Sequence, residues 1–173
     1  MSGRVIWITG IPGSGKSALA EALASHIDGA VVLRMDDLRR LATPRPTYSE
    51  EERDILYGSL VYAALSVART GSDVIIDATA NRRRWRDMAR ELAPGFVEIY
   101  LRCQLKTASQ REQARVDTKG APRDIYKKAA GGAPVPGVGV EYEEPLAAEV
   151  VIDSDRMRIE EEARIVMDAL EAR

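Results

Sequence analysis

The chain has 173 residues, a length that favours a single domain spanning residues 1–173. Its formal net charge of −2 gives no overall attraction to nucleic acid or to an anionic membrane, so neither is an expected partner. One cysteine and one histidine exclude an internal disulfide bond and a zinc site, and the N-terminal segment does not read as a signal peptide or membrane span, so we expect a cytoplasmic protein.

Short apolar, β-branched runs alternate with longer segments of helical periodicity, which is typical of an α/β fold with a parallel sheet. The runs are almost continuously apolar, as strands covered on both faces should be. The expected strands are Arg4–Thr9, Ala30–Met35, Val74–Asp77, Phe96–Arg102 and Val150–Asp153. The expected helices are Lys16–Ser25, Ser49–Arg69, Arg83–Leu92, Leu105–Arg115 and Ile159–Ala172.

The first strand runs directly into GIPGSGKS, residues 10–17, which fits the phosphate-loop pattern G-x-x-x-x-G-K-[ST]. Glycines let backbone N–H groups turn inward around phosphate oxygens, and the following helix adds its positive N-terminal end. We expect Lys16 to bridge the β- and γ-phosphates of a nucleoside triphosphate and Ser17 to hold Mg²⁺. The predicted nucleotide-binding residues here are Gly10, Pro12, Gly13, Ser14, Gly15, Lys16, Ser17 and Ala18.

Carboxylates end the second and third strands, at the sheet edge where open α/β folds bind ligands. Asp36 or Asp37 in LRMDD could take the proton of an attacking hydroxyl, although the pair could also cap the following turn. Asp77 in VIIDAT could hold Mg²⁺ through water, with a simple helix cap as the alternative.

The next two predicted helices, Ser49–Arg69 and Arg83–Leu92, show capping residues and an arginine cluster respectively. Ser49 is a candidate N-cap, Glu52 completes a capping box, and Gly71 can close that helix. In NRRRWRDMAR the arginines cannot all face the core, so we expect Arg83 and Arg86 to bind phosphate or sulfate. A nucleic-acid-binding patch is the less favoured interpretation of these arginines, because few aromatic residues are interleaved with them.

A long basic loop, Arg111–Gly137, is predicted to act as a lid that folds over the triphosphate and excludes water. Its cationic residues are Arg115, Arg123, Lys127 and Lys128. A solvated loop without such a role is the alternative.

Together, GIPGSGKS, MDDLRR, YSEEER, DATANRRRWRDMARE, IYKKAAGG, PGVGVEYEEP and AEVVIDS resemble the adenylylsulfate kinase family over nearly the whole chain. The resemblance implies a P-loop fold of three α/β/α layers with a five-stranded parallel sheet and a basic lid, often as a homodimer. It also implies phosphorylation of the 3′-hydroxyl of adenosine 5′-phosphosulfate with ATP and Mg²⁺.

The resemblance assigns roles residue by residue. The catalytic residues are expected to be Lys16, Asp36 and Lys127, with Ser17 and Asp77 at the metal and Arg111 and Arg115 adding to the nucleotide site. The residues expected to bind the acceptor substrate are Asp36, Arg39, Arg45, Asn81, Arg83 and Lys127.

The departures from the family pattern fall on the acceptor side. Arg34 stands where the family has an aspartate, Ala80 replaces a serine, and Val135 replaces an aromatic that would stack on adenine. Arg45 is displaced by one position from the family's arginine, and Tyr48 stands where the family has its aromatic residue. Leu56 and Ser59 replace an asparagine and an arginine, and the segment QARVDTKGA is an insertion. Two alternatives follow: a kinase acting on another nucleotide or a small alcohol, and a nucleotide-binding regulatory or nucleic-acid-processing protein.

Overall fold

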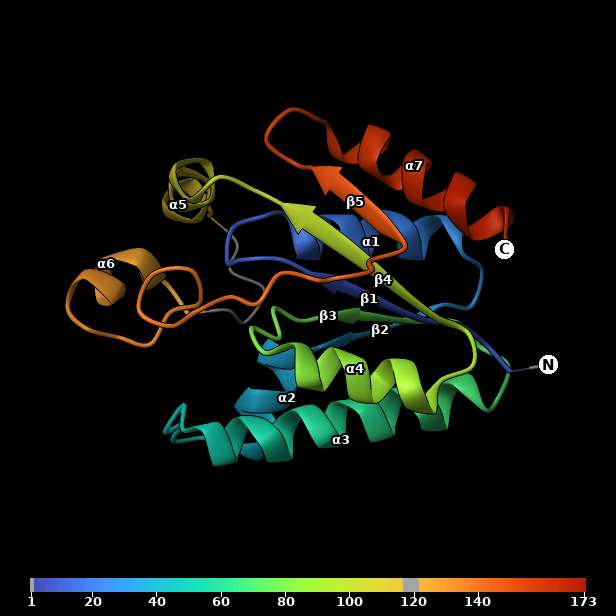
Figure 1. Cartoon of the computed structure of the whole chain (residues 1–173), viewed down its shortest axis with the longest axis horizontal. Coiled ribbons are helices and arrows are strands. Elements are labelled where there is room, and N and C mark those ends of the chain that lie inside the picture. The colour runs from blue at the N-terminus through green and yellow to red at the C-terminus, as the bar shows by residue number, and fades with distance from the viewer. Residues whose placement is uncertain (1, 117–121) are drawn as a thin grey trace.

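A computed structural model describes residues 2–116 and 122–173. Its centre is one fully parallel sheet of five strands in the order β2–β3–β1–β4–β5 (Figure 1). Val5 of the central strand lies beside Val74 on one side and Phe96 on the other. The strands are β1 (Val5–Thr9), β2 (Val31–Arg34), β3 (Val74–Asp77), β4 (Phe96–Arg102) and β5 (Val150–Asp153), so the strand prediction is confirmed to within a residue at each end.

The described helices include the five that the sequence predicts and two that it does not. The predicted ones are α1 (Lys16–His26), α3 (Glu50–Ala68), α4 (Arg83–Leu92), α5 (Leu105–Ala114) and α7 (Ile159–Glu171). The additional ones are α2 (Met35–Ala42) and α6 (Ile125–Ala130). Both are too short to show a clear helical period in sequence, and α2 buries only Met35.

Helices cover both faces of the sheet and make three layers (Figure 1). On one face, α1 and α7 pack against Ile6, Ile8 and Ile75. On the other face, α3 and α4 pack against side chains that include Trp7, which is fully buried. Because successive side chains of a strand point to opposite faces, β1 to β4 contribute to both cores, whereas Val150 and Ile152 of β5 belong only to the core beside α1 and α7.

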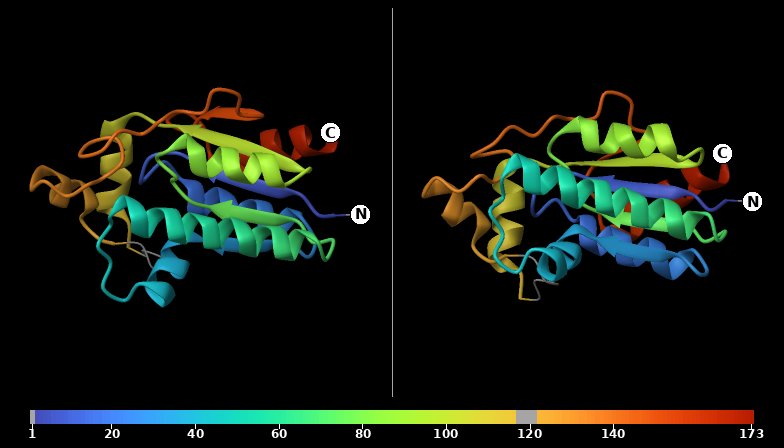
Figure 2. Two further views of the ribbon diagram at one scale, coloured as in Figure 1. Left: turned by 60° about the horizontal axis from the view of Figure 1, so that its bottom comes forward. Right: turned by 90° about the horizontal axis from the view of Figure 1, so that it is seen from below.

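The connections at the carboxyl ends of the strands gather at one end of the molecule, while both termini lie toward the other end (Figure 2). There α5 and α6 form a small core of their own, with Ala108, Tyr126, Ala129 and Val135, packed against Ile11. The expected lid segment, residues 111–137, therefore contains one helix that was not predicted, α6, whereas its first residues belong to α5 as expected. Residues 117–121, which carry much of the inserted segment, lie outside the described residues.

The start of α3 is capped only in part as predicted. The Ser49 hydroxyl accepts a hydrogen bond of 3.2 Å from the backbone N–H of Glu52. The Glu52 carboxylate does not complete the box, because it accepts bonds from Thr47 and pairs with Arg39 of α2. A charged guanidinium is a stronger partner for a carboxylate than a neutral backbone N–H. Glu52 therefore links α2 to α3.

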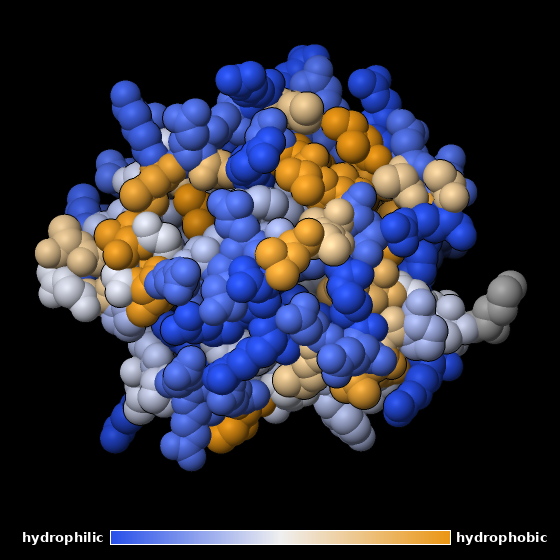
Figure 3. All heavy atoms as spheres, viewed as in Figure 1, coloured by the Kyte–Doolittle hydropathy of each residue, from blue (hydrophilic) through white to orange (hydrophobic). Residues whose placement is uncertain are grey.

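Hydrophilic side chains dominate the face of Figure 1, and the apolar ones lie among them in separate groups (Figure 3). Of the helices that the structure describes, none has the length and apolar character needed to cross a bilayer.

Candidate active site

The phosphate loop, residues 10–17, joins β1 to α1 and has the backbone that the sequence predicts. Gly13 has φ of 81° and Gly15 has φ of 107°, values that favour glycine. A Cβ on Gly13 would lie 2.2 Å from the carbonyl oxygen of Ala108, so α5 packs directly on this turn. The Tyr126 hydroxyl of α6 donates to the Pro12 carbonyl at 2.5 Å and fixes the loop from the other helix.

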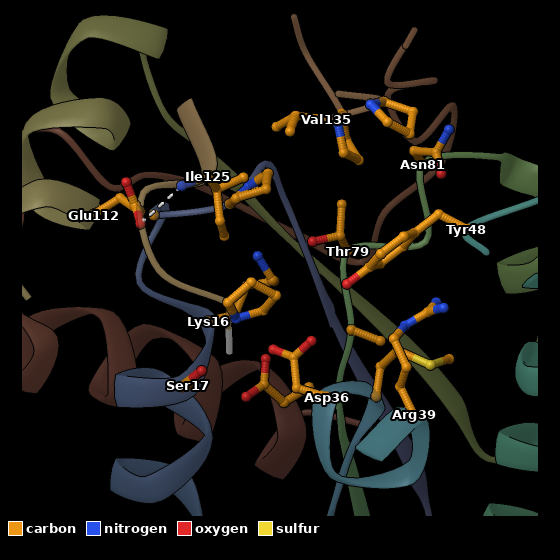
Figure 4. A pocket seen from close by; sticks show the side chains of 18 of the residues that line it. Lys16, Ser17, Asp36, Arg39, Tyr48, Thr79, Asn81, Glu112, Ile125 and Val135 are labelled. Atoms are coloured by element: carbon orange, nitrogen blue, oxygen red, sulfur yellow. Dashed lines mark hydrogen bonds between the residues drawn. The ribbon is translucent and has the colours of Figure 1, made fainter. Parts of the chain in front are cut away.

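A cavity of about 550 Å³ starts at the phosphate loop and continues along the carboxyl edge of the sheet. One end, here called the donor end, is formed by Pro12, Gly13, Gly15–Ala18, Arg111 and Arg115. The other, here called the acceptor end, is formed by Arg39, Tyr48, Arg53, Asn81 and Pro134–Pro136. Figure 4 shows Asp36 between Lys16 on one side and Arg39 and Tyr48 on the other.

Lys16 lies at the floor of the donor end and is 9% exposed. Its ammonium donates to the carbonyl oxygens of Gly10 and Ile11, both at 3.0 Å. Burial lowers the pKa of Lys16, and the nearby carboxylates of Asp77 and Asp36 oppose that shift. The ammonium thus lies beside the two carboxylates that the sequence places at this edge.

Asp36 sits in the first turn of α2 and lines the cavity. Burial raises the pKa of its carboxyl, and the neighbouring charge of Asp77 raises it further. Asp37 is instead paired with Arg40 on the same helix, at 2.9 Å. Of the two aspartates that the sequence left open, Asp36 is therefore the one that faces the cavity.

Asp77 ends β3 beside Arg34, which ends the neighbouring strand β2. The Arg34 Nε lies 3.6 Å from the Asp77 carboxylate, and the same guanidinium pairs with Glu21 at 3.0 Å. The departure from the family pattern at position 34 thus puts a cation directly beside this carboxylate.

Ser17 and Asp77 both line the cavity and could contribute to a magnesium site. A hydroxyl and a carboxylate are hard oxygen ligands of the kind that Mg²⁺ takes one or two at a time, together with water and phosphate. Within the described residues, no group of three or more histidine, cysteine, aspartate or glutamate side chains could form a protein-only metal cage. The residues present therefore fit a metal that is shared with a nucleotide.

Two arginines of the predicted lid reach the cavity from α5 and the residue after it. Arg111 donates to the Ser154 carbonyl at 2.7 Å. Arg115 has buried Nε and Nη2 atoms for which the described residues offer no hydrogen-bond partner. Unpartnered guanidinium donors that face a cavity suit an anionic ligand.

The acceptor end includes a residue that sequence reasoning missed. Arg53 lines the cavity, and its guanidinium donates to the Asn81 side chain at 3.4 Å and to the Pro134 carbonyl at 3.2 Å. Burial lowers the pKa of Arg53. Its spacing in the sequence could have indicated this position. Arg53 precedes the buried Leu56 and Tyr57 by three and four residues, so it shares their face of α3.

Other predicted contacts do not meet the cavity. The Lys127 side chain is 69% exposed and pairs with Asp124, Arg45 is exposed, and Arg83 donates to the Glu144 carbonyl. Arg86 was expected to bind phosphate or sulfate, and this is wrong, because its side chain is only 1% exposed and pairs with Glu98 of β4 at 2.7 Å. Gly10 and Ser14 lie in the phosphate loop behind the residues that line the cavity.

The parallel sheet, the phosphate loop and a carboxylate between two ends of one cavity define a P-loop kinase. Comparison with known proteins narrows this class to one family. The family model described as adenylylsulphate kinase matches residues 2–153, and the chain belongs to that family.

Individual relatives agree with this assignment. A chain of Archaeoglobus fulgidus, named a probable adenylyl-sulfate kinase, is 36% identical over 158 residues, covering 88% of this chain and 96% of its own length. The adenylyl-sulfate kinase of Paraburkholderia xenovorans is 34% identical, covering 92% of this chain and 88% of its own. The APS kinase of Mycobacterium tuberculosis in complex with AMPPNP and APS superposes with a TM-score of 0.84, at 26% identity and 98% coverage of both chains.

Proposed function

We propose that the protein transfers the γ-phosphoryl group of ATP to the 3′-hydroxyl of adenosine 5′-phosphosulfate. The observation that carries this proposal is one continuous cavity, which joins the phosphate loop to an arginine-lined end with Asp36 between them. The similar enzyme of Mycobacterium tuberculosis, whose structure holds AMPPNP and APS together, supports the same arrangement of two nucleotides.

At the donor end, the triphosphate would be held by the backbone N–H groups of the phosphate loop and by Lys16. Lys16 already lies between the loop carbonyls and the two carboxylates, so a small movement of its flexible side chain reaches a phosphate oxygen. Arg111 and Arg115 would contribute further positive charge from α5. These groups would stabilise the charge that develops on the transferred phosphoryl group.

Ser17 and Asp77 would hold Mg²⁺, which supplies neutralisation of the phosphate charge when it is bound. Arg34 lies beside Asp77, with its Nε 3.6 Å from that carboxylate, and its charge would help to hold the carboxylate at the end of β3.

Asp36 would accept the proton of the attacking hydroxyl. Its pKa is raised by burial and by Asp77, which makes it a stronger base than an exposed aspartate once it is ionised. Residues of α5 and α6, among them Glu112 and Ile125, line the same cavity and would limit the access of water as a competing phosphoryl acceptor.

The acceptor end would bind an anionic nucleotide. Arg53 brings a guanidinium group to it, Arg39 brings a second that also pairs with Glu52, and Asn81 adds an amide. The Tyr48 ring, which lies 4.9 Å from the Arg39 guanidinium, offers one flat face to a base, while Val135 offers an aliphatic surface rather than a second ring. We propose Arg45, Arg83 and Lys127 as outer cationic residues only, because each is engaged or exposed away from the cavity.

A coupled assay of ADP release tests the function. ATP with Mg²⁺ should give slow release, and addition of adenosine 5′-phosphosulfate should stimulate it strongly, with the 3′-phosphorylated product confirmed by mass. Absence of stimulation, with ATP binding retained, would reject this acceptor and favour a different nucleotide or a small alcohol.

We also propose that the protein forms a homodimer, as the family resemblance implies. Sedimentation at micromolar protein concentration would test this, and a purely monomeric boundary would contradict it.

A further inference from the structure

Arg86 is one of the most deeply buried charged residues of the structure, at 1% exposure, yet it lies outside the cavity. Its Nε donates to Glu98 at 2.7 Å, and Glu98 is itself 4% exposed. The remaining nitrogens donate to backbone carbonyls: Nη1 to Ala80, and Nη2 to Glu143 at 2.6 Å. One guanidinium therefore connects three segments that are distant in sequence.

The first of these carbonyls belongs to a strained residue. Ala80 has φ of 42°, a left-handed value that is unfavourable for a residue with a Cβ. Its backbone is held from two sides, because its N–H donates to the Tyr57 hydroxyl at 2.8 Å and its carbonyl accepts from Arg86. The next residue is Asn81, which lines the acceptor end.

The second carbonyl belongs to the segment 141–144, which clamps Asn81 from the other side. The Glu143 N–H donates to the Asn81 carbonyl at 2.8 Å, and the Asn81 side-chain amide donates to the Glu141 carbonyl at 3.0 Å. Between these residues, the Tyr142 ring lies 5.6 Å from the Arg86 guanidinium. Arg86 thus touches the backbone on both sides of Asn81.

The guanidinium of Arg86 is held against the sheet by ion pairs that centre on Glu98 of β4. The second carboxylate oxygen of Glu98 accepts from Arg90 at 3.0 Å, and Arg90 also pairs with Glu149 at 2.5 Å. Glu149 in turn accepts the backbone N–H of Glu98 at 2.6 Å. This four-residue ion network fixes the Arg86 guanidinium relative to β4.

We propose that Arg86 is a positioning residue of the acceptor end: it holds the backbone of Ala80 and Glu143 so that Asn81 faces the bound acceptor. The assignment of this end to the acceptor rests on the proposed function. The chemistry of the guanidinium explains why arginine is needed, because only a planar fork reaches a carboxylate and two carbonyls at once. A lysine can pair with Glu98 but cannot make the three contacts together.

The test compares R86K with E98Q. R86K should raise the KM for adenosine 5′-phosphosulfate about tenfold or more, since bonds from a charged donor are lost, and should leave the KM for ATP within about twofold. E98Q is the matched control, because its amide oxygen still accepts from Arg86 and both carbonyl contacts remain. It should lower the melting temperature while its acceptor KM stays within about twofold of wild type. Equal effects of the two variants on the acceptor KM would overturn the proposal.

A second measurement does not depend on the substrate. In R86K, amide hydrogen exchange should quicken around residues 78–82 and 141–145 and stay unchanged in the phosphate loop. Uniformly faster exchange would indicate a merely structural role and overturn the proposal. If wild type does not respond to adenosine 5′-phosphosulfate, the proposed function fails, and the exchange pattern still decides the role of Arg86. If R86K does not fold, R86M/E98Q removes both charges of the pair and takes its place in both measurements.

Discussion

The two ends of the cavity are built in different ways. The donor end comes mainly from one short stretch, residues 12–18, whose backbone makes the site. The acceptor end gathers Arg39 from α2, Arg53 from α3, Asn81 from the β3–α4 connection and Val135 from beyond α6. Glycines take the left-handed conformations in the phosphate loop, whereas Tyr48 and Ala80 take them at the acceptor end.

This difference has a physical consequence. A glycine adopts positive φ at little cost, so the donor end is stable by local preference. A residue with a Cβ pays about 1–3 kcal/mol for a sparsely populated conformation, which tertiary contacts must offset. The conformation of the acceptor end therefore depends on supporting side chains more than that of the phosphate loop does.

The largest expected effect lies where the two ends meet. Asp36→Asn should lower kcat by about 10²–10⁴-fold, because the group that takes the hydroxyl proton is lost. The affinity for ATP, measured by equilibrium titration, should change little. Asp37→Asn is the control, since Asp37 pairs with Arg40 outside the cavity. Similar losses in both variants would remove the special role of Asp36.

At the donor end, Lys16→Ala should lower kcat by about 10²–10³-fold, by loss of a cation that stabilises the developing charge. Unlike an acceptor-end variant, it should also weaken ATP binding and slow the basal ADP release seen without acceptor. A variant with normal ATP affinity would contradict the contact between Lys16 and the triphosphate.

At the acceptor end, Arg53→Ala should raise the KM for adenosine 5′-phosphosulfate about 10- to 100-fold, as expected for the loss of a charged hydrogen-bond donor. The KM for ATP should stay within about twofold. Lys127→Ala is the informative comparison, because Lys127 was predicted from sequence but is exposed and pairs only with Asp124 among the described residues. A larger effect at Lys127 than at Arg53 would reverse the assignment made from the cavity.

The smallest effect on activity, with a clear effect on stability, is expected at Glu162 in the first turn of α7. This carboxyl is 1% exposed, and burial raises its pKa to about 7, against the nearby charge of Arg111. The folded state therefore keeps a proton that the unfolded chain releases near its ordinary pKa of 4.5, so stability falls as pH rises from about 4.5 to about 7.

Glu162→Gln removes this dependence and should make the protein roughly 3 kcal/mol more stable than wild type at pH 8, with little difference at pH 4. Urea unfolding at the two pH values measures it. Glu160→Gln, on the exposed side of the same turn, should show no such difference. A stabilisation by Glu162→Gln that is equal at both pH values would contradict the raised pKa.

Much of the fold and of the donor end could be predicted from sequence. The apolar runs located the strands because burial on both faces leaves a strong pattern, and the phosphate loop was readable because its contacts come from consecutive residues. Helix α6 was missed because six residues carry little periodicity, so the segment between the predicted helix Leu105–Arg115 and Gly137 was interpreted as one loop.

The arginines show most clearly what could not be predicted from the sequence. Arg53 and Arg86 both lie in charged, helical segments, and sequence reasoning chose Arg86 as the ligand residue and overlooked Arg53. The structure reverses these two roles. Glu98 of β4 pairs with Arg86 inside the protein. Among the described residues, the Arg53 guanidinium donates to the Asn81 side chain and the Pro134 carbonyl, and it stays at the cavity.

The sequence by itself determined the sheet, the phosphate loop and the family, since each depends on local patterns or on consecutive residues. Only the tertiary structure decided which of the cationic side chains face the acceptor and which support the wall behind it. The reason is that a guanidinium goes to the best acceptors within its reach, and those acceptors lie on segments that only folding brings together.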